Sequence, residues 1–359
     1  MQMYKNLLLL QNFKVYLFLI IVLFSCKKDI NKENAIKNEY SMSYKIYNYS
    51  TNIEIFYPHI RKKVKIQKTD LPIKSCIVVN TSTLGFLQEL NLINKISAVC
   101  SPKYIYNIDI QSNIKNNKIL DFGNDQNWNI EKILTSDIKF IFTSYNPNFE
   151  NSYTLLENSG KKIIFIEEYR ENHPLGKTEY LKLFGILFGN ESNSFYKFNS
   201  IKNNYNRLKI LASKQKFRPS VFSKIMYGDI WYIPKAQSVT AQLFKDANLN
   251  YLWNDIEGID SKALSFVQVY NKAKEADFWL DVSDVETKNQ LLAQNYFYKD
   301  FNAFKNNKMY SLIGRKKNDA NDFYESGTVR ADWVLKDIIS ITYPDLFLNY
   351  NLIYYYKLK

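Results

Sequence analysis

Histidine is scarce in this chain, because its 359 residues include only His59 and His173. Binding sites for bare zinc or manganese ions are usually built from several histidines together with carboxylates. Two histidines that lie far apart in the sequence do not supply such a set. The composition therefore argues against direct binding of these ions, and we expect neither histidine to be a metal ligand.

The sequence also lacks Gly-x-Ser-x-Gly, the motif that exposes a nucleophilic serine in α/β hydrolases. Carboxylates are plentiful, with Glu167 beside Glu168 and Asp319 near Asp322. No spacing selects one pair of them as the acid and base of a glycosidase. We therefore predict no catalytic residue and no enzyme activity, and we keep a secreted hydrolase as the less favoured alternative.

Long apolar runs are absent apart from residues 15–24, which follow two lysines near the N-terminus. This run is too short to span a bilayer core of roughly 30 Å as a helix. It ends in Leu23, Phe24, Ser25 and Cys26, the pattern of a bacterial lipoprotein cleavage site. The pattern predicts a signal peptide at residues 1–25, with Cys26 as the acylated N-terminus that anchors the protein to a membrane on its periplasmic side.

The net charge is +13, but the lysines are scattered among asparagine and tyrosine. A nucleic-acid-binding protein usually gathers its basic residues into one patch, and a secreted protein rarely meets nucleic acid. We expect most lysines to lie on a solvated surface, while the overall charge favours an anionic ligand or an anionic membrane face.

From residue 75 onward, short apolar runs alternate with amphipathic stretches, which is typical of parallel strands joined by helices. In the first half, Asn80 to Thr83 and Asn129 supply helix caps, the latter for a short helix at residues 130–134. The expected strands are residues 76–79, 95–100, 118–122, 138–144 and 161–166.

Cys76 and Cys100 fall at opposite ends of neighbouring expected strands. The offset of three to four residues corresponds to roughly 10 Å, which is beyond the reach of a disulfide. We therefore expect two buried free thiols.

The second half repeats the alternation. Its expected strands are residues 223–227, 278–282 and 308–312, and its expected helices are residues 238–247, 266–273 and 331–341. Between the halves lies a helical stretch at about residues 178–212, interrupted at Gly185, Gly189 and Asn190.

These patterns predict an α/β fold with two Rossmann-like lobes joined by a long helix and a ligand cleft between them. A rigid connection permits only small movements, so the cleft is expected to be nearly preformed. The predicted division is a signal peptide at 1–25, a tether and N-terminal extension at 26–70, an N-terminal lobe at 71–170, the connecting helix at 171–215 and a C-terminal lobe at 216–359. We expect the fold itself to begin near residue 45.

Seven short segments occur in the order known from one protein family. They are residues 80–92, 123–142, 173–177, 184–189, 264–266, 324–332 and 343–347. In them the chain resembles the class III periplasmic substrate-binding proteins of ABC importers, of the iron-siderophore and cobalamin type, and particularly the lipoproteins of this kind from Bacteroidetes. The resemblance covers most of residues 71–347 and implies a monomer that delivers its ligand to an ABC permease without chemistry and without a cofactor.

Members of this family dock on the permease through one acidic residue on each lobe. Glu131 matches the position in the N-terminal lobe, although a glutamate in the first turn of a helix is also stabilised by the helix dipole alone. In the C-terminal lobe the matching position holds Lys245, and Asp246 is adjacent. Either residue is left open as the second docking position.

The candidate ligand contacts all fall in predicted loops at strand ends. They are Tyr104, Asn124, Tyr145, Trp231, Tyr232, Tyr324, Glu325 and Arg330. Aromatic walls suit a bulky, partly apolar ligand, and Arg330 offers a fork of donors to a carboxylate, phosphate or catecholate. The alternative is that Arg330 pairs with Glu325 or Asp332.

The sequence does not separate three ligands: a ferric siderophore, cobalamin or a related corrinoid, and haem. Positive charge leans towards an anionic ferric siderophore. An aromatic, mostly neutral cleft suits a corrinoid, while the many tyrosines keep haem open because haem iron accepts a tyrosine ligand. A purely structural or adhesive lipoprotein, without a deep cleft, is the remaining alternative.

Overall fold

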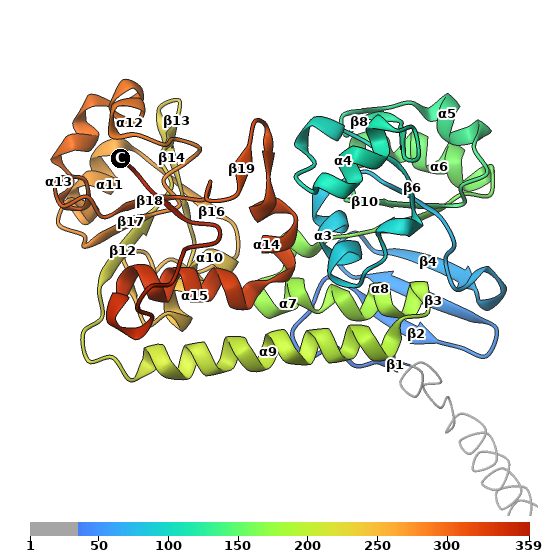
Figure 1. The fold of residues 1–359 in the computed structure, drawn as a ribbon, viewed down its shortest axis with the longest axis horizontal. Helices are drawn as coiled ribbons and strands as arrows, with labels where there is room; N and C mark the ends of the chain where they lie inside the picture. Colours follow the sequence, from blue (N-terminus) through green and yellow to red (C-terminus); the bar gives the residue numbers. More distant parts are fainter. Residues whose placement is uncertain (1–34) are drawn as a thin grey trace, which may run out of the picture.

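The computed structural model describes residues 35–359, so the predicted signal peptide and Cys26 lie outside the described residues. Figure 1 shows two α/β lobes side by side, with a long helix running beneath both of them. The chain therefore has the predicted fold class. Within the described part, no helix is both long enough and apolar enough to cross a membrane.

The N-terminal lobe is built on a five-stranded parallel sheet with the order β11-β10-β5-β6-β7. Its strands are β5 (Cys76–Val78), β6 (Ile96–Val99), β7 (Leu120–Asp121), β10 (Phe140–Thr143) and β11 (Lys162–Phe165). The crossover helices are α3 (Thr81–Glu89), α4 (Ile108–Lys115), α5 (Ile130–Thr135) and α6 (Glu150–Asn158). All five strands fall where the apolar runs predicted them.

The predicted helix cap at Asn129 and the two predicted free thiols of this lobe are also present. The side chain of Asn129 accepts a hydrogen bond from the backbone N–H of Lys132 at 3.0 Å, which caps α5. Cys76 begins β5 and Cys100 follows β6, and both are buried free cysteines, as predicted. Burial raises the pKa of the Cys100 thiol to about 12, which keeps it protonated.

The C-terminal lobe carries a second five-stranded sheet with the order β15-β12-β17-β18-β21, in which only β21 is antiparallel. Its strands are β12 (Ser220–Ser223), β15 (Asn250–Tyr251), β17 (Phe278–Leu280), β18 (Met309–Ser311) and β21 (Tyr356–Lys357). Its helices are α10 (Val239–Asp246), α11 (Phe266–Ala273), α12 (Lys288–Gln294), α13 (Asn302–Lys305), α14 (Ser326–Val329) and α15 (Ala331–Thr342).

Both lobes also contain small antiparallel sheets of two or three strands. In the C-terminal lobe β13 (Met226–Tyr227), β14 (Ile230–Pro234) and β16 (Ser261–Leu264) form a three-stranded sheet, and β19 (Lys316–Lys317) pairs with β20 (Ala320–Asn321). In the N-terminal lobe β8 (Gly123–Asn124) pairs with β9 (Asn127–Trp128). The expected strand at residues 223–227 is wrong, because the chain ends β12 at Ser223 and turns before β13.

The helical connection is a hairpin and then one long helix. After α7 (Pro174–Thr178) and α8 (Tyr180–Phe188), Gly189 adopts a left-handed φ of 67° and the chain reverses into α9 (Glu191–Ser213). Gly185 does not interrupt α8, contrary to expectation. An added Cβ there would lie 1.9 Å from Ser194 Oγ, so glycine lets α8 and α9 approach closely.

The fold begins earlier than residue 45. Residues 35–67 form a four-stranded antiparallel sheet of β1 (Ala35–Ile36), β2 (Lys45–Asn48), β3 (Asn52–Tyr57) and β4 (Lys62–Gln67). Two buried carboxylates hold its first loop: Glu179 accepts three backbone N–H bonds from residues 39–41, and Glu171 accepts N–H bonds from Met42 and Ser43. The carboxylates that hold residues 39–43 lie more than a hundred residues away in the sequence. No local apolar pattern therefore marks this loop as part of the fold, which is why the predicted start was too late.

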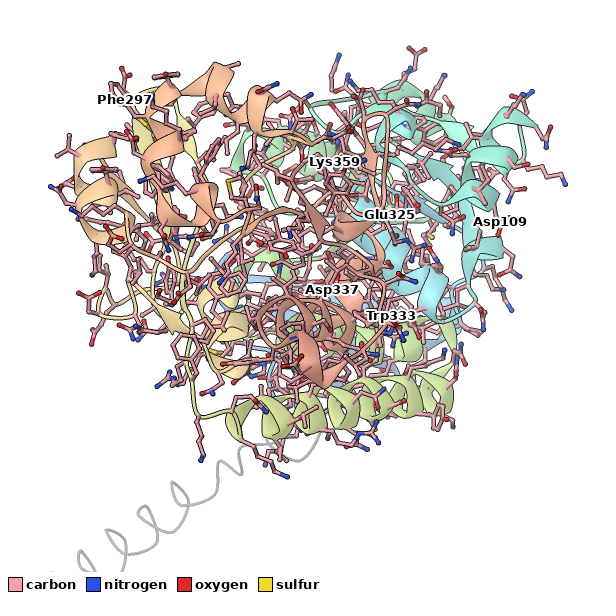
Figure 2. The ribbon with its side chains drawn as sticks, turned by 60° about the vertical axis from the view of Figure 1, so that its left-hand side comes forward. Asp109, Phe297, Glu325, Trp333, Asp337 and Lys359 are labelled. Carbon is pink, nitrogen blue, oxygen red and sulfur yellow. The ribbon has the colours of Figure 1, made fainter. Side chains whose placement is uncertain are left out.

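One carboxylate, Asp337, accepts several hydrogen bonds from the C-terminal segment. Asp337 of α15 accepts backbone N–H bonds from Ile353, Tyr354 and Tyr355 and a hydroxyl bond from Tyr350. Figure 2 labels Asp337 on α15 and Lys359 at the chain end. These bonds return the C-terminal segment to the sheet, where β21 pairs with β18.

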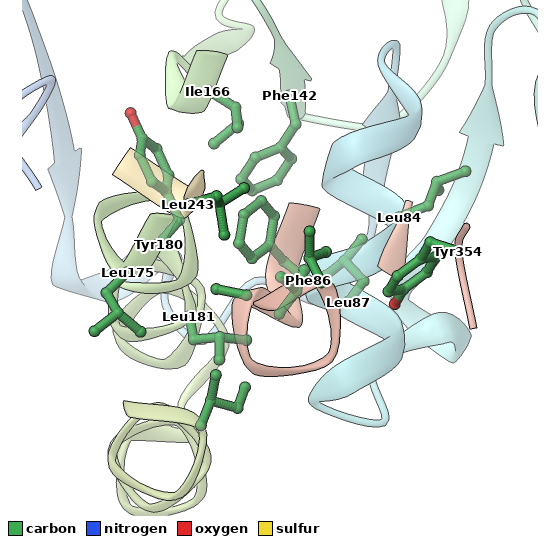
Figure 3. Close-up of a cluster of buried hydrophobic side chains, with 14 of the residues drawn as sticks. Leu84, Phe86, Leu87, Phe142, Ile166, Leu175, Tyr180, Leu181, Leu243 and Tyr354 are labelled. Carbon is green, nitrogen blue, oxygen red and sulfur yellow. The ribbon is translucent and has the colours of Figure 1, made fainter. Parts of the chain in front are cut away.

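One hydrophobic core spans both lobes. Figure 3 shows Leu84 and Phe86 of α3 in the same buried cluster as Leu243 of α10 and Tyr354 of the C-terminal segment. Because apolar side chains from both lobes share this cluster, opening the lobes would expose apolar surface, which disfavours wide separation.

Candidate ligand cleft

A cavity of about 440 Å³ lies at the carboxyl edge of the parallel strands of the C-terminal lobe. Lys224 follows β12, Asp281 follows β17 and Leu312 follows β18, and all three line the cavity. Its volume falls in the range of about 300–1,000 Å³ that is usual for small-molecule sites. Open α/β sheets bind their ligands at this edge.

Two of the predicted ligand contacts meet at this cavity. Tyr232 on β14 is 44% exposed and Tyr324 is 56% exposed, and both side chains line it. Tyr227 on β13 lines the same cavity and is still more exposed. Three tyrosines thus present apolar ring surface and hydroxyl groups to one space.

Charges of both signs lie beside these rings. Lys224 Nζ is 3.5 Å from Asp281 Oδ2, and Asp281 also accepts a hydrogen bond of 2.6 Å from the Tyr355 hydroxyl. Asp284, another lining residue, pairs with Lys316 at 3.1 Å. The charges beside the cavity are therefore nearly balanced rather than strongly cationic.

Sequence reasoning missed Lys224, Tyr227 and Asp281. The expected strands at 223–227 and 278–282 ran past the true ends of β12 and β17, so these residues counted as strand interior. A signal was available: the first polar residue after a buried parallel strand lies at the carboxyl edge, and Lys224 and Asp281 both occupy that place.

The predicted contacts in the N-terminal lobe lie outside this cavity. Tyr104 follows β6 and is 42% exposed, Asn124 ends β8 and is exposed, and Tyr145 follows β10. The hydroxyl of Tyr145 donates to Glu150, and its backbone N–H donates to Glu167 at 2.6 Å. Their role as ligand contacts stays a prediction.

Glu168 follows β11 at the same edge of the N-terminal sheet and is almost completely buried. Its Oε2 atom has no hydrogen-bond partner among the described residues. Burial raises the pKa of this carboxyl group, and the nearby Lys177 opposes that shift. The N-terminal lobe therefore keeps one buried acceptor unsatisfied.

Trp231 is not a ligand contact, which corrects the expectation. It is 0% exposed, because it occupies the inward-facing position of β14 next to the outward-facing Tyr232. Its indole N–H donates to the carbonyl of Ser223 at 3.0 Å, and its ring packs against Phe222 and Trp279.

Glu325 also has a different role from the predicted one. Its buried carboxylate accepts hydrogen bonds from the backbone N–H groups of Tyr106 and Asn107, which belong to the N-terminal lobe. Figure 2 shows Glu325 where the C-terminal lobe meets the N-terminal lobe. A second contact between the lobes brings Lys103 Nζ to 3.7 Å from Asp319 Oδ2.

Arg330 makes the alternative pairing, with Asp332. Its Nε and Nη2 atoms lie 2.9 and 2.8 Å from the two carboxylate oxygens, and the guanidinium stacks 3.7 Å from the centre of the Trp333 ring. Because its donors are used and the side chain is only 15% exposed, Arg330 is not available as a free anion-binding fork.

The two possible docking positions of the C-terminal lobe differ in accessibility. Asp246 is buried, with its carboxylate 2.8 Å from both the Tyr205 hydroxyl and Lys209 Nζ, so it fastens α10 to α9. Lys245 is exposed. His173 lies 4.0 Å from Asp246 and caps α7 by accepting the N–H of Leu175.

Glu131 in the first turn of α5 is exposed, which is compatible with both docking and a simple dipole interaction. In residues 35–359 no group of three or more His, Cys, Asp or Glu side chains is placed to hold a metal ion.

No family model matches the chain. An uncharacterised lipoprotein of Methanocaldococcus jannaschii is 24% identical over 300 residues, which is 79% of this chain and 70% of that protein. Similar solved structures include a possible iron-binding periplasmic solute-binding protein of Staphylococcus epidermidis (17% identity, TM-score 0.59, 76% of this chain and 99% of that one). The chain has the two-lobe fold of periplasmic solute-binding proteins.

Two further structures support the same fold. A periplasmic haem-binding protein of Pseudomonas aeruginosa is 12% identical with a TM-score of 0.60, covering 80% of this chain and 98% of its own. An Fe3+-hydroxamate transport protein of Saccharomonospora viridis is 12% identical with a TM-score of 0.58, covering 79% and 96%. At these identities the similarity establishes fold and leaves the ligand open.

The inter-lobe bond of Glu325 predicts a pH effect on stability. Burial raises the pKa of Glu325 to about 7, Asp322 raises it further, and the two N–H donors and Arg315 oppose the shift. In the unfolded chain this group titrates near its usual 4.5, so the folded state holds the extra proton between the two values. Stability from this group is therefore greatest below pH 4.5 and falls by about 3 kcal/mol as the pH rises to 7.

We expect Glu325→Gln to remove most of this fall. Chemical denaturation at several values between pH 5 and pH 8 measures it, with Glu131→Gln as the exposed control. An unchanged slope in the Glu325 variant would contradict the assignment.

Proposed function

We propose that this protein is a substrate-binding lipoprotein of an ABC importer, which captures a ferric siderophore or a cobalamin-like ligand and delivers it to the permease. The observation that carries the proposal is the tyrosine-lined cavity at the carboxyl edge of the C-terminal sheet, in a two-lobe fold whose lobes are joined by α9. The lining residues all belong to the C-terminal lobe, and a shared core and the inter-lobe bonds of Glu325 hold the N-terminal lobe beside it.

The side chains that line the cavity favour a ligand with both apolar and polar parts. Tyr227, Tyr232 and Tyr324 offer rings for apolar contact and hydroxyl groups for hydrogen bonds, while Lys224 supplies a cation. This mixture suits a siderophore, whose iron chelate is polar and whose scaffold is partly apolar. The balanced charge also suits a corrinoid, so both ligands stay in the proposal. Likeness to an Fe3+-hydroxamate transport protein and a possible iron-binding protein supports the siderophore.

Haem is the second candidate, because exposed tyrosines surround the cavity and one similar structure is named as haem-binding. Tyrosine binds haem iron as the phenolate. Desolvation of the hydroxyl group raises the pKa of Tyr324, and the carboxylates of Asp284 and Asp281 raise it further, which disfavours its phenolate. Tyr324 is therefore a poor axial ligand under this alternative, which leaves Tyr227 and Tyr232 as the candidates.

Delivery requires a membrane location and a docking surface. The anchor is assigned to Cys26 on the sequence pattern, and a lipoprotein among the relatives supports it. Glu131 is the proposed docking residue of the N-terminal lobe. Since Asp246 is buried, the second contact of the docking model falls to exposed residues such as Lys245. We expect the protein to act as a monomer.

The test is a tryptophan-fluorescence titration of the chain from residue 27 with a ferric hydroxamate, a ferric catecholate, cyanocobalamin, cobinamide and haemin. Trp231 and Trp279 lie in the core beneath the cavity lining and report binding there. We expect saturable quenching at submicromolar concentration by one class. Saturation by haemin alone would select the second candidate, and no response from a folded sample would reject both.

A further inference from the structure

The N-terminal antiparallel sheet has one buried and one open face. In an antiparallel pair, residues directly opposite each other point to the same side of the sheet. Ile46, Ile55 and Val64 form one such row across β2, β3 and β4, and all three are buried. The rows on either side of it therefore point away from the body of the protein.

The open face is basic and aromatic. One row consists of Lys45, Phe56 and Lys63, and the next consists of Tyr47, Glu54 and Lys65. All three lysines are exposed.

The single acid of this face is already neutralised, because Glu54 pairs with Lys63 at 2.9 Å. Within residues 35–359 no carboxylate makes an ion pair with Lys45 or Lys65, so the face keeps a net positive charge.

This face cannot turn freely relative to the lobes. The Tyr57 hydroxyl on β3 accepts the backbone N–H of Phe165 on β11 at 3.1 Å, which joins the sheet to the N-terminal lobe. Glu171 and Glu179 hold the loop before β2. A surface that contacts this face therefore fixes the orientation of the whole protein.

The position of the proposed lipid anchor indicates that the contacting surface is the membrane. Cys26 precedes Ala35 of β1 by nine residues, a length that spans at most about 30 Å. A lipid on Cys26 therefore keeps β1–β4 near the bilayer. Exposed lysines near an anionic surface are attracted to it, and aromatic rings favour the interface.

We infer that the open face of β2–β4, with Lys45, Lys63 and Lys65, lies against an anionic phospholipid surface and orients the lobes on it. The inference rests on the proposed lipid anchor. It goes beyond that anchor, since it assigns a second, electrostatic contact that a tether alone does not need.

The test uses the chain from residue 27, which contains every described residue but carries no lipid. It is sedimented with vesicles of phosphatidylcholine alone and of phosphatidylcholine with a third of phosphatidylglycerol. We expect binding only to the anionic vesicles, and loss of that binding at high salt. The variant Lys45→Glu, Lys63→Glu, Lys65→Glu is expected to lower the partition coefficient by about tenfold or more.

A matched control reverses three exposed lysines of the C-terminal lobe, Lys262, Lys274 and Lys305, and so changes the net charge equally. This control is expected to retain binding. Equal loss in both variants, or no binding by the unaltered chain, would overturn the inference. Ligand titration of the sheet variant separates the two proposals. Normal ligand binding together with lost vesicle binding supports the membrane contact. If the unaltered chain binds none of the ligands in the panel, only the transport proposal is contradicted.

Discussion

Replacing Asp337 with alanine is expected to cost about 4 kcal/mol of folding free energy. The substitution leaves the buried N–H groups of Tyr354 and Tyr355 and the partly buried N–H of Ile353 without their acceptor. It also frees the Tyr350 hydroxyl. Burial raises the pKa of Asp337, so removal of the charge recovers part of the loss, and the net effect is smaller than the sum of the four bonds.

Urea denaturation followed by circular dichroism measures this loss. Tyr350→Phe, which removes one of the four donors, is expected to cost only about 1 kcal/mol. Asp345→Ala, at an exposed position just beyond α15, is the matched control and should leave stability unchanged. A loss below that of Tyr350→Phe would show that Asp337 does not hold the C-terminal segment.

Gly85→Ala is expected to disrupt the contact between the two lobes. An added Cβ at Gly85 on α3 would lie 2.3 Å from the carbonyl oxygen and 2.6 Å from the carbonyl carbon of Glu325. Both atoms belong to the backbone of the other lobe, so the clash cannot be relieved by rotating a side chain. Relief requires α3 and α14 to move apart, which strains the bonds from Tyr106 and Asn107 to Glu325.

We expect this variant to lose about 2–3 kcal/mol of stability, as overpacked cores do, and to bind its ligand more weakly. Small-angle scattering should show a larger radius of gyration than for the unaltered chain. Asn203→Ala, at an exposed position on α9, is the control. An unchanged radius together with unchanged stability would mean that the lobes are not held in contact at α3 and α14.

The sheet of the N-terminal lobe was largely predictable because its central strands are buried on both faces, whereas in the C-terminal lobe only β17 and β18 were predicted and β15 and β21 were missed. Residues 76–79 and 138–144 form short apolar runs, and helices α11 and α15 begin and end almost where periodicity placed them. Such local patterns arise because the buried positions of a single helix or strand are apolar. The turn between α8 and α9 was harder to place. Gly185 and Gly189 are both glycines within one apolar helical stretch, but only Gly189 adopts a positive φ and ends the helix.

The candidate site was predictable only in part, since its residues depend on contacts between distant segments. Tyr232 and Tyr324 lie at the cavity, whereas the neighbouring Trp231 and Glu325 point into the core and across to the other lobe. A one-residue step along a strand reverses the direction of a side chain, so an error of one residue in register changes a ligand contact into a core residue. The partners of Glu325 are more than two hundred residues away in sequence.

The most direct test of the transport proposal repeats the ligand titration by calorimetry with the ligand that the panel identifies. The unaltered chain should bind one molecule, and Tyr232→Ala combined with Tyr324→Ala should weaken binding by about a hundredfold, because the contacts of two aromatic rings with the ligand are lost. Tyr296→Ala, which removes an exposed tyrosine outside the cavity lining, should bind normally. Equal affinity of the unaltered chain and the double variant would contradict the placement of the ligand in this cleft.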